Sequence, residues 1–120
     1  MALKVLFPTP LSQEELKTEF RQARDCGKVR LGASCCYFTR FSGTVCLPYD
    51  AIVRAWLRQE EVNANLCCGR ANFDQFFLMV QDQSGNTHKA EVVSKELGKE
   101  ALSLISQHRP QVEIGYRREA

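Results

Sequence analysis

The stretch from Thr44 to Glu61 constrains the fold more than any other part of the chain. An apolar run ends at Pro48, a tight turn is expected at Tyr49-Asp50, and a second apolar run begins at Ile52. From there the residues alternate between two faces, with Val53, Ala55 and Leu57 on one and Arg54, Trp56 and Arg58 on the other. A repeat of two residues is typical of a β-strand with one buried and one solvated face. The stretch therefore predicts two strands of an antiparallel sheet joined by a corner.

The composition is that of an ordinary globular domain. The chain has 120 residues, of which 44% are apolar and 25% charged, and its net charge is +2. This length favours one domain, residues 1–120, with a core of its own. Nucleic-acid binders usually carry a strong basic excess, so neither nucleic acid nor more than a peripheral membrane contact is expected. No apolar run approaches the ~20 residues of a membrane helix, and no signal-peptide pattern is present. We therefore expect a cytoplasmic protein.

Six cysteines, among them two adjacent pairs, invite a disulfide interpretation. They are Cys26, Cys35, Cys36, Cys46, Cys67 and Cys68. In a chain without a signal peptide, free thiols in a reducing compartment are the better interpretation. Neighbouring residues of a strand point to opposite faces, so Cys35 and Cys36 are not expected to share a partner.

Residues 1–27 are expected to form an extended arm followed by a helix. Ser12 and Glu15 have the spacing of a capping box, in which each side chain bonds the other residue's backbone N–H. Gly27 suits the position just after a helix, where a left-handed conformation is common. The sequence therefore predicts a helix that begins after Ser12 and ends before Gly27.

Residues 28–93 predict a series of short antiparallel strands. Turn residues at Asn63–Asn65 and at Ser84-Gly85-Asn86 separate the longer strands. The expected strands are Val29–Leu31, Ser34–Thr39, Thr44–Leu47, Val53–Val62, Phe76–Gln81 and Thr87–Val93, with another starting at Leu66–Cys68.

Residues 94–109 predict a second helix, with Ser94 as its N-cap and Pro110 as its stop. Residues 111–116 predict a short terminal strand. The resulting class is α+β and mostly β. We expect a bent antiparallel sheet or partial barrel of six to seven strands, with the C-terminal helix capping one open end and an extra N-terminal helix.

One segment resembles a known family. Leu47 to Ala55, Leu-Pro-Tyr-Asp-Ala-Ile-Val-Arg-Ala, is similar to the turn between the third and fourth strands of bacterial PH and GRAM-like domains. With the order of expected elements, residues 28–109 resemble the PH-like superfold, and most closely small bacterial PH-like proteins of unassigned function. The resemblance implies a seven-stranded bent sheet with a capping helix. It also implies binding of phosphoinositides, phosphopeptides, polyproline or proteins, among which the fold does not choose.

The same resemblance suggests where an anion would bind. Lipid-binding PH domains carry a Lys in the first strand pair, followed later by Arg-x-Arg. Lys28, Arg30 and Arg40 lie in the corresponding region, although no Arg-x-Arg completes the pattern. These three residues are the candidate anion contacts. An anionic-ligand or lipid-headgroup binder, with salt-sensitive binding to acidic liposomes, is therefore one alternative function.

Thiol, metal and catalytic chemistry have less support. Structural zinc sites use Cys-x₂₋₄-Cys spacing, which adjacent cysteines do not provide. A reactive thiol needs a lowered pKa at a helix N-terminus or beside a cation, and neither Cys26 nor Cys68 is predicted at a helix N-terminus. His88 falls in a strand, His108 ends a helix, and no nucleophile or phosphate-loop motif is present. We expect no metal, no cofactor and no enzyme, and keep a thiol-based metal or redox protein as a third alternative.

Arg54, Trp56 and Arg58 are the candidate contacts with a partner. Their arginines and indole would suit a phosphate or a stacked base, and a tryptophan flanked by arginines is also the composition of a protein-interface hot spot. A plainer interpretation is a solvated face with Trp56 half-covered by the N-terminal arm or helix. The leading prediction is a PH-like interaction module that binds a protein partner or a second copy of itself. The strand at 111–116 would extend a sheet edge within one chain or between two.

Overall fold

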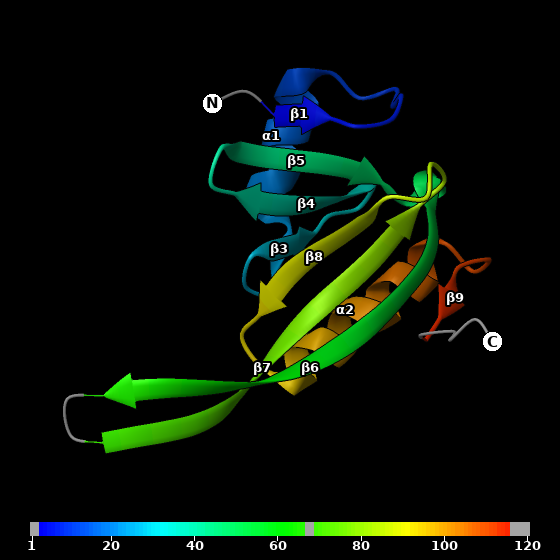
Figure 1. Cartoon of the computed structure of the whole chain (residues 1–120). Helices are drawn as coiled ribbons and strands as arrows, with labels where there is room; N and C mark the ends of the chain where they lie inside the picture. Colours follow the sequence, from blue (N-terminus) through cyan, green and yellow to red (C-terminus); the bar gives the residue numbers. More distant parts are fainter. Residues whose placement is uncertain (1–2, 67–68, 116–120) are drawn as a thin grey trace.

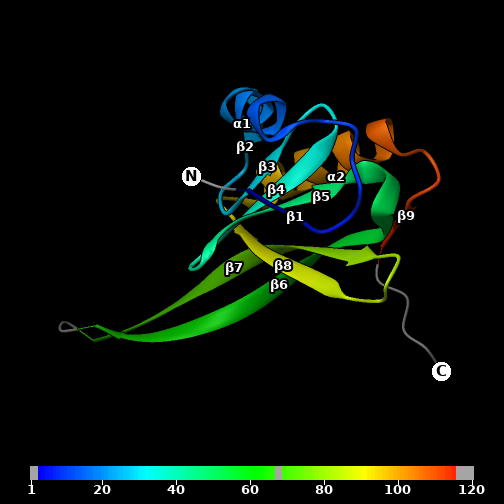
Figure 2. The same ribbon diagram turned by 90° about the horizontal axis from the view of Figure 1, so that it is seen from above.

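Two β-sheets and two α-helices make up the computed structural model of this chain, which describes residues 3–66 and 69–115 (Figure 1 and Figure 2). The first sheet has the strand order β1-β5-β4-β3-β2, and the second has the order β8-β7-β6-β9. Most neighbouring strands are antiparallel, whereas β1 and β9 are parallel additions, one at an edge of each sheet. The predicted class, a mostly β α+β domain, is confirmed.

The first sheet is built from five short strands. These are β1 (Leu3–Val5), β2 (Arg24–Asp25), β3 (Val29–Leu31), β4 (Cys35–Arg40) and β5 (Gly43–Pro48). The predicted strands in this region are confirmed to within a residue at each end. β4 and β5 form a hairpin that runs from Cys35 opposite Pro48 to Arg40 opposite Gly43. The predicted N-terminal arm supplies β1, which lies parallel to β5.

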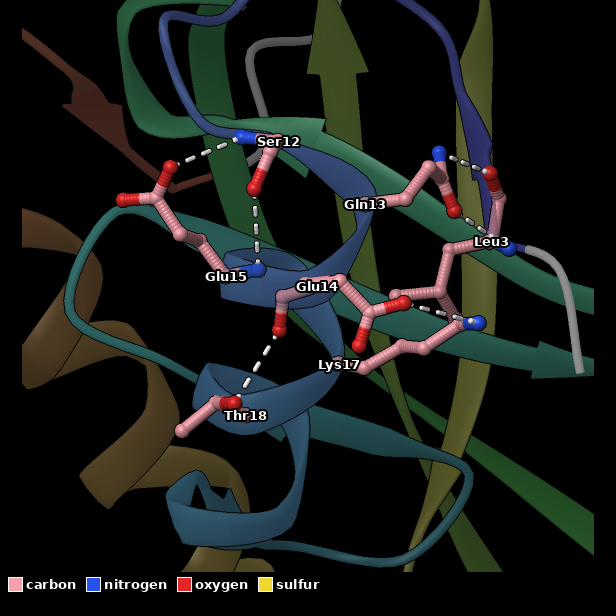
Figure 3. A network of polar contacts seen from close by, with 7 residues as sticks. All are labelled: Leu3, Ser12, Gln13, Glu14, Glu15, Lys17 and Thr18. Carbon is pink, nitrogen blue, oxygen red and sulfur yellow. Dashed lines mark hydrogen bonds and ion pairs between the residues drawn. The ribbon is translucent and has the colours of Figure 1, made fainter.

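Helix α1 (Gln13–Gln22) covers the outer face of the first sheet and begins at the predicted capping box. The Ser12 hydroxyl accepts a hydrogen bond from the Glu15 N–H at 3.2 Å, and the Glu15 carboxylate accepts one from the Ser12 N–H at 3.2 Å (Figure 3). The Gln13 side chain exchanges two further hydrogen bonds with the backbone of Leu3, at 3.2 and 3.0 Å. The start of α1 is thereby tied to β1.

The predicted end of this helix was wrong. The helix ends at Gln22, with Ala23 as an extended C-cap, rather than just before Gly27. The physical reason is that Arg24–Asp25 pair with β3 as strand β2, which requires extended backbone immediately after the helix. Gly27 consequently has a different role, described below.

The second sheet follows a one-turn 3-10 helix, η1 (Tyr49–Ala51), which forms the predicted corner. Its strands are β6 (Ile52–Leu66), β7 (Gly69–Asp82), β8 (Thr87–Val92) and β9 (Glu113–Ile114). β6 and β7 form one long antiparallel hairpin, and β8 returns along the other side of β7. The predicted terminal strand is present in shortened form, paired in parallel with β6.

The hairpin is longer than predicted. β6 continues through Asn63–Asn65 in register with β7, so the turn predicted there was wrong. Leu66 ends β6 instead of starting a new strand, and Cys67-Cys68 lie outside the described residues. Asparagine favours turns in isolation, but here the cross-strand pairing with β7 outweighs that local preference.

A β-bulge changes the start of β6. Ile52 lies opposite Asp82 and Arg54 lies opposite Gln81, so Val53 is an extra residue in the ladder. Val53 is 38% exposed, whereas Ile52 is fully buried. The prediction that Val53 shares the buried face of the residues after it was therefore wrong, because a bulge shifts the alternation by one residue. From Arg54 onward the predicted alternation is confirmed.

The larger core lies between the two sheets and helix α2 (Lys95–His108). The helix begins at the predicted cap, where Ser94 accepts a hydrogen bond from the Leu97 N–H at 3.2 Å, and it ends just before Pro110. Its buried residues face side chains of both sheets. The core includes Val29, Leu31, Cys36, Phe38, Leu47, Ile52, Ala55, Leu78, Val80, Ala90, Val92, Ala101 and Ile105.

A smaller core fills the space between the first sheet and α1. It contains Leu3, Leu16, Cys35, Tyr37 and Cys46. Cys35 belongs to this core and Cys36 to the larger one, which confirms that the two neighbouring thiols point to opposite faces of β4. The first sheet is therefore buried on both faces.

Gly27 joins the two sheets where they meet. It forms an isolated antiparallel bridge with Val92 of β8, flanked by hydrogen bonds from Lys28 N–H to the Glu91 carbonyl at 2.8 Å and from Val93 N–H to the Cys26 carbonyl at 3.0 Å. Its φ of +131° is left-handed, and a Cβ here would lie 2.7 Å from the Glu91 carbonyl oxygen. Only glycine allows this approach of the two backbones.

The prediction from this contact compares two glycines of nearly equal φ. Gly43 has a φ of +133° but no atom within 4 Å of an added Cβ. We expect Gly43→Ala to lower the free energy of unfolding by about 1 kcal/mol through backbone strain alone. Gly27→Ala should lower it by about 1–3 kcal/mol more, because the sheets must also separate. Urea unfolding of both variants measures the difference, and equal losses would contradict the role given to Gly27.

Candidate functional site

The outer face of the second sheet carries the three residues predicted to contact a partner. Arg54, Trp56 and Arg58 lie on the face of β6 turned away from the core, while Ala55 between them is fully buried. The Arg58 side chain is 56% exposed, and Trp56 is half-buried. Helix α1 does not cover this face, because it is on the far side of the first sheet (Figure 2). The structure thus brings the three predicted residues together on one surface.

Carboxylates of β6 and β9 and a lysine of β8 share this surface. Arg54 forms a 2.5 Å ion pair with Glu113 of β9, and Arg58 lies 3.6 Å from Glu60. Lys89 of β8 donates to the same Glu60 at 2.6 Å and lies 4.2 Å from the centroid of the Phe77 ring. The Lys89 hydrogen bond holds the pKa of Glu60 below its ordinary value. The surface therefore mixes both charges over aromatic rings, and it is not a basic stripe of the kind that binds nucleic acid.

Beyond this surface, β6 and β7 continue as a two-stranded arm, defined here as residues 60–66 and 69–75. β8 pairs with β7 only from Phe76 to Gln81, and β9 pairs only with Arg54 and Ala55 of β6. Among residues 3–66 and 69–115, no third strand pairs with the arm. Figure 1 and Figure 2 show it projecting from the body. The radius of gyration, 15.3 Å, accordingly exceeds the value of about 14 Å expected for a compact chain of this length.

The sequence does contain a signal for the arm. Val62, Ala64 and Leu66 alternate with Asn63 and Asn65, which is the period of a strand. The asparagines favoured a turn in the prediction because turn residues are strong local signals. Lys89 lies on β8, whereas Glu60 and Arg58 lie on β6. Only the register of β6, β7 and β8 reveals that Lys89 lies beside Glu60.

The three candidate anion contacts do not converge. Arg30 donates to the Phe20 carbonyl at 3.3 Å and lies 4.5 Å from the centroid of the Phe20 ring, on the α1 side of the first sheet. Arg40 donates to the Lys89 carbonyl at 2.5 Å and lies over Phe38, whose ring belongs to the larger core. Lys28 is exposed before β3. The two arginines therefore lie on opposite faces of the first sheet. Anion binding at these residues stays a prediction.

The thiols of the described cysteines are buried and free. Burial, followed by the charge of Glu19, raises the pKa of Cys35 to about 12 and that of Cys46 to about 11. Burial likewise raises the pKa of Cys26 and of Cys36. Thiols with raised pKa values are poor nucleophiles at neutral pH. Within residues 3–66 and 69–115, no three His, Cys, Asp or Glu side chains gather into a metal site.

His88 has a structural partner. Its Nε2 lies 2.8 Å from the Asp82 carboxylate, whose other oxygen accepts hydrogen bonds from Ser84 N–H at 2.9 Å and Asn86 N–H at 3.1 Å. Burial by itself raises the pKa of Asp82, but the bonds from His88, Asn86 and Ser84 outweigh it and hold the pKa below its ordinary value. This group fixes the turn between β7 and β8, and with it the position of Lys89.

The lowered pKa of Asp82 predicts an acid-sensitive contribution to stability. Asp82→Asn should lower the free energy of unfolding by about 1–3 kcal/mol at neutral pH, because the buried anion supports three hydrogen bonds. Because the pKa of this carboxyl is lower in the folded state, its ionised form stabilises the fold at pH values above the unfolded pKa of about 3.9. This stabilisation is lost as the pH falls through the folded-state pKa. The difference between the two proteins should therefore shrink in acid. Asp50→Asn, at a side chain that is 100% exposed, is the control in urea titrations, and an equal loss there would mean that the buried anion does not stabilise the turn.

The comparisons with known proteins give a family. Residues 8–120 match the family described as Domain of unknown function (DUF6709). No curated protein matches the chain, and no solved structure matches it. Neither helix in the described part is both long and apolar enough to cross a membrane. Because the match spans nearly all of its residues, the chain belongs to the DUF6709 family.

Proposed function

We propose that this protein is a PH-like interaction domain that binds an extended segment of a protein along its β6–β7 arm. The PH-like part of the proposal is supported by the antiparallel strands of two sheets, with η1 at the corner that carries the family-like motif. It is also supported by a C-terminal helix that packs against both sheets. The parallel strands β1 and β9 and the length of the arm are features that the resemblance does not imply.

The observation that carries the binding proposal is the unsupported length of the arm. From Glu60 opposite Gln75 to Leu66 opposite Gly69, the two strands pair only with each other among the described residues. A two-stranded hairpin is marginally stable in water, and a third strand is the usual remedy. Neither outer edge of the arm pairs with a further strand of the described part of the chain, which is the arrangement that strand addition uses.

The surface beside the arm offers side chains that could make the specific contacts of a bound segment, which backbone pairing alone does not provide. Backbone hydrogen bonds give affinity in strand addition, whereas side-chain contacts give specificity. Trp56, Phe77 and Arg58 lie at the base of the arm on the outer face, and tryptophan and arginine are the residues most often found at interface hot spots. A protein segment that pairs with the arm and then passes over the outer face of the sheet would therefore reach this surface.

A photo-crosslinking residue placed in the arm tests the proposal in the host cell. We expect a crosslinker at Asn72 to capture a protein, because Asn72 lies at the middle of the β7 half of the arm. The same residue at the exposed position Glu14 on α1, behind the first sheet, is the control. Capture at neither position, or equal capture at both, would contradict the proposal. The mass of the captured product tells a second copy from a different protein.

Replacement of Trp56 tests the anchor. We expect Trp56→Ala to reduce the yield of the Asn72 crosslink, while thermal unfolding shows a folded protein that has lost only about 1–2 kcal/mol. The reason is that Trp56 is half-buried on the outer face and does not belong to either core. Val53→Ala, on the same strand but at the bulge, is the matched control. If Trp56→Ala simply unfolds, Trp56 is a core residue and the hot-spot hypothesis is wrong.

A further inference from the structure

The free edge of β7 has a defined set of backbone groups. The Asp82 N–H donates to the Asn86 carbonyl at 2.9 Å, so the peptide groups of even-numbered β7 residues point to the β8 side. Alternate residues of a strand direct their N–H and C=O to the same edge, and the ladder between β6 and β7 has no bulge from Arg54 to Leu66. The residues that present both groups on the free part of this edge are Arg70, Asn72 and Asp74.

The sequence of this edge is self-complementary. It reads Gly-Arg-Ala-Asn-Phe-Asp-Gln from Gly69 to Gln75. When two copies are placed antiparallel about Asn72, Arg70 of each copy comes opposite Asp74 of the other, and Asn72 comes opposite itself. Each of these pairs can exchange two backbone hydrogen bonds, and opposite charges at facing positions stabilise the pairing. In the same register the small Ala71 comes opposite the large Phe73.

The body has room for the end of a second arm. A surface cleft of about 530 Å³ lies at the base of the arm, lined by Asp74, Gln75, Phe76 and residues 91–96. Val93, in the wall of this cleft, is 75% exposed although it is apolar. In the register centred on Asn72, Gly69 of the second copy comes opposite Gln75. The end of the second arm therefore arrives at the cleft, where β8 has already turned away into α2.

The β6 edge is less suited to a second copy. If two copies paired along this edge, Arg58 of one copy would come opposite Glu60 of the other. These two side chains already lie 3.6 Å apart within one chain, and Glu60 also accepts the hydrogen bond from Lys89. Part of this edge is moreover occupied by β9. The charges of Arg58 and Glu60 are thus satisfied within one chain, whereas the pattern on β7 is matched by a second copy.

We infer that the chain forms a two-fold symmetric dimer through the β7 edge of the arm, antiparallel and centred on Asn72. The inference rests on the proposed function, because it names a second copy as the protein that pairs with the arm. Two-fold symmetric dimers are the commonest homo-oligomers, and their interfaces pair one surface with itself. The arms overlap so that each chain supplies the third strand that the other lacks.

A charge swap in the full-length chain tests the register. Sedimentation across a concentration series should give twice the 13.6-kDa chain mass for the natural protein. Arg70→Asp and Asp74→Arg should each raise the dimer dissociation constant at least ~10-fold, because each sets like charges opposite one another twice per dimer. The double variant should restore the dimer, because it sets opposite charges in place again. Positions four apart on a strand are ~13 Å distant, so the swap cannot be repaired within one chain.

Two controls separate pairing from folding. Arg21→Asp makes the same charge change on α1, behind the first sheet, and should leave the dissociation constant unchanged. Thermal unfolding should show that all four variants are folded. A monomeric natural protein at every concentration overturns the inference, as does a double variant that stays as weak as the single variants. A dimer that neither single variant weakens overturns the register.

The sedimentation and crosslinking results together distinguish failure of this inference from failure of the proposed function. If the purified protein is monomeric and the Asn72 crosslinker captures a different protein in cells, the arm binds a protein but not a second copy. If the purified protein is monomeric and the crosslinker captures nothing, both the inference and the proposed function fail. A crosslinked product of twice the chain mass supports both.

Discussion

The antiparallel pairing of β6 with β7 is the interaction on which the rest of the structure depends. Its first half is supported on both sides, by β8 and β9 at its edges and by α2 against its inner face. Its second half has no third strand among the described residues. One continuous hairpin therefore both closes the core and extends beyond it. The packing that holds the body together also fixes the base, direction and register of the arm.

Alternation along single strands explains how a chain of this size builds two cores. Cys35 and Cys36 lie in different cores because neighbouring strand residues point to opposite faces. The first sheet can therefore carry α1 on one face and the second sheet on the other. The thiols contribute as small buried apolar groups, and their raised pKa values agree with a packing role. Gly27 then brings the two sheets together by backbone contact alone.

The parts of the fold that depend on local chemistry were predictable from the sequence. The caps at Ser12 and Ser94, strands β3 to β5 and the outward face of Arg54 and Trp56 all follow from signals within a few residues. The bulge at Val53 and the arm were not predictable in this way, because each is decided by pairing with a strand distant in sequence. The residues of the candidate site likewise include some that were predictable from local sequence and some that were not. Its three β6 residues follow from alternation, whereas its partners on β8 and β9 follow only from register.

The central claim is that the β7 edge of the arm is covered by a second copy of the chain. Amide hydrogen exchange, followed residue by residue by NMR over a range of protein concentrations, tests it most directly. We predict that the amides of Arg70, Asn72 and Asp74 exchange more slowly as the concentration rises. The amides of Ala71 and Phe73, which point to β6, should change less. Exchange at Arg70, Asn72 and Asp74 that stays the same at every concentration would contradict the claim for a second copy.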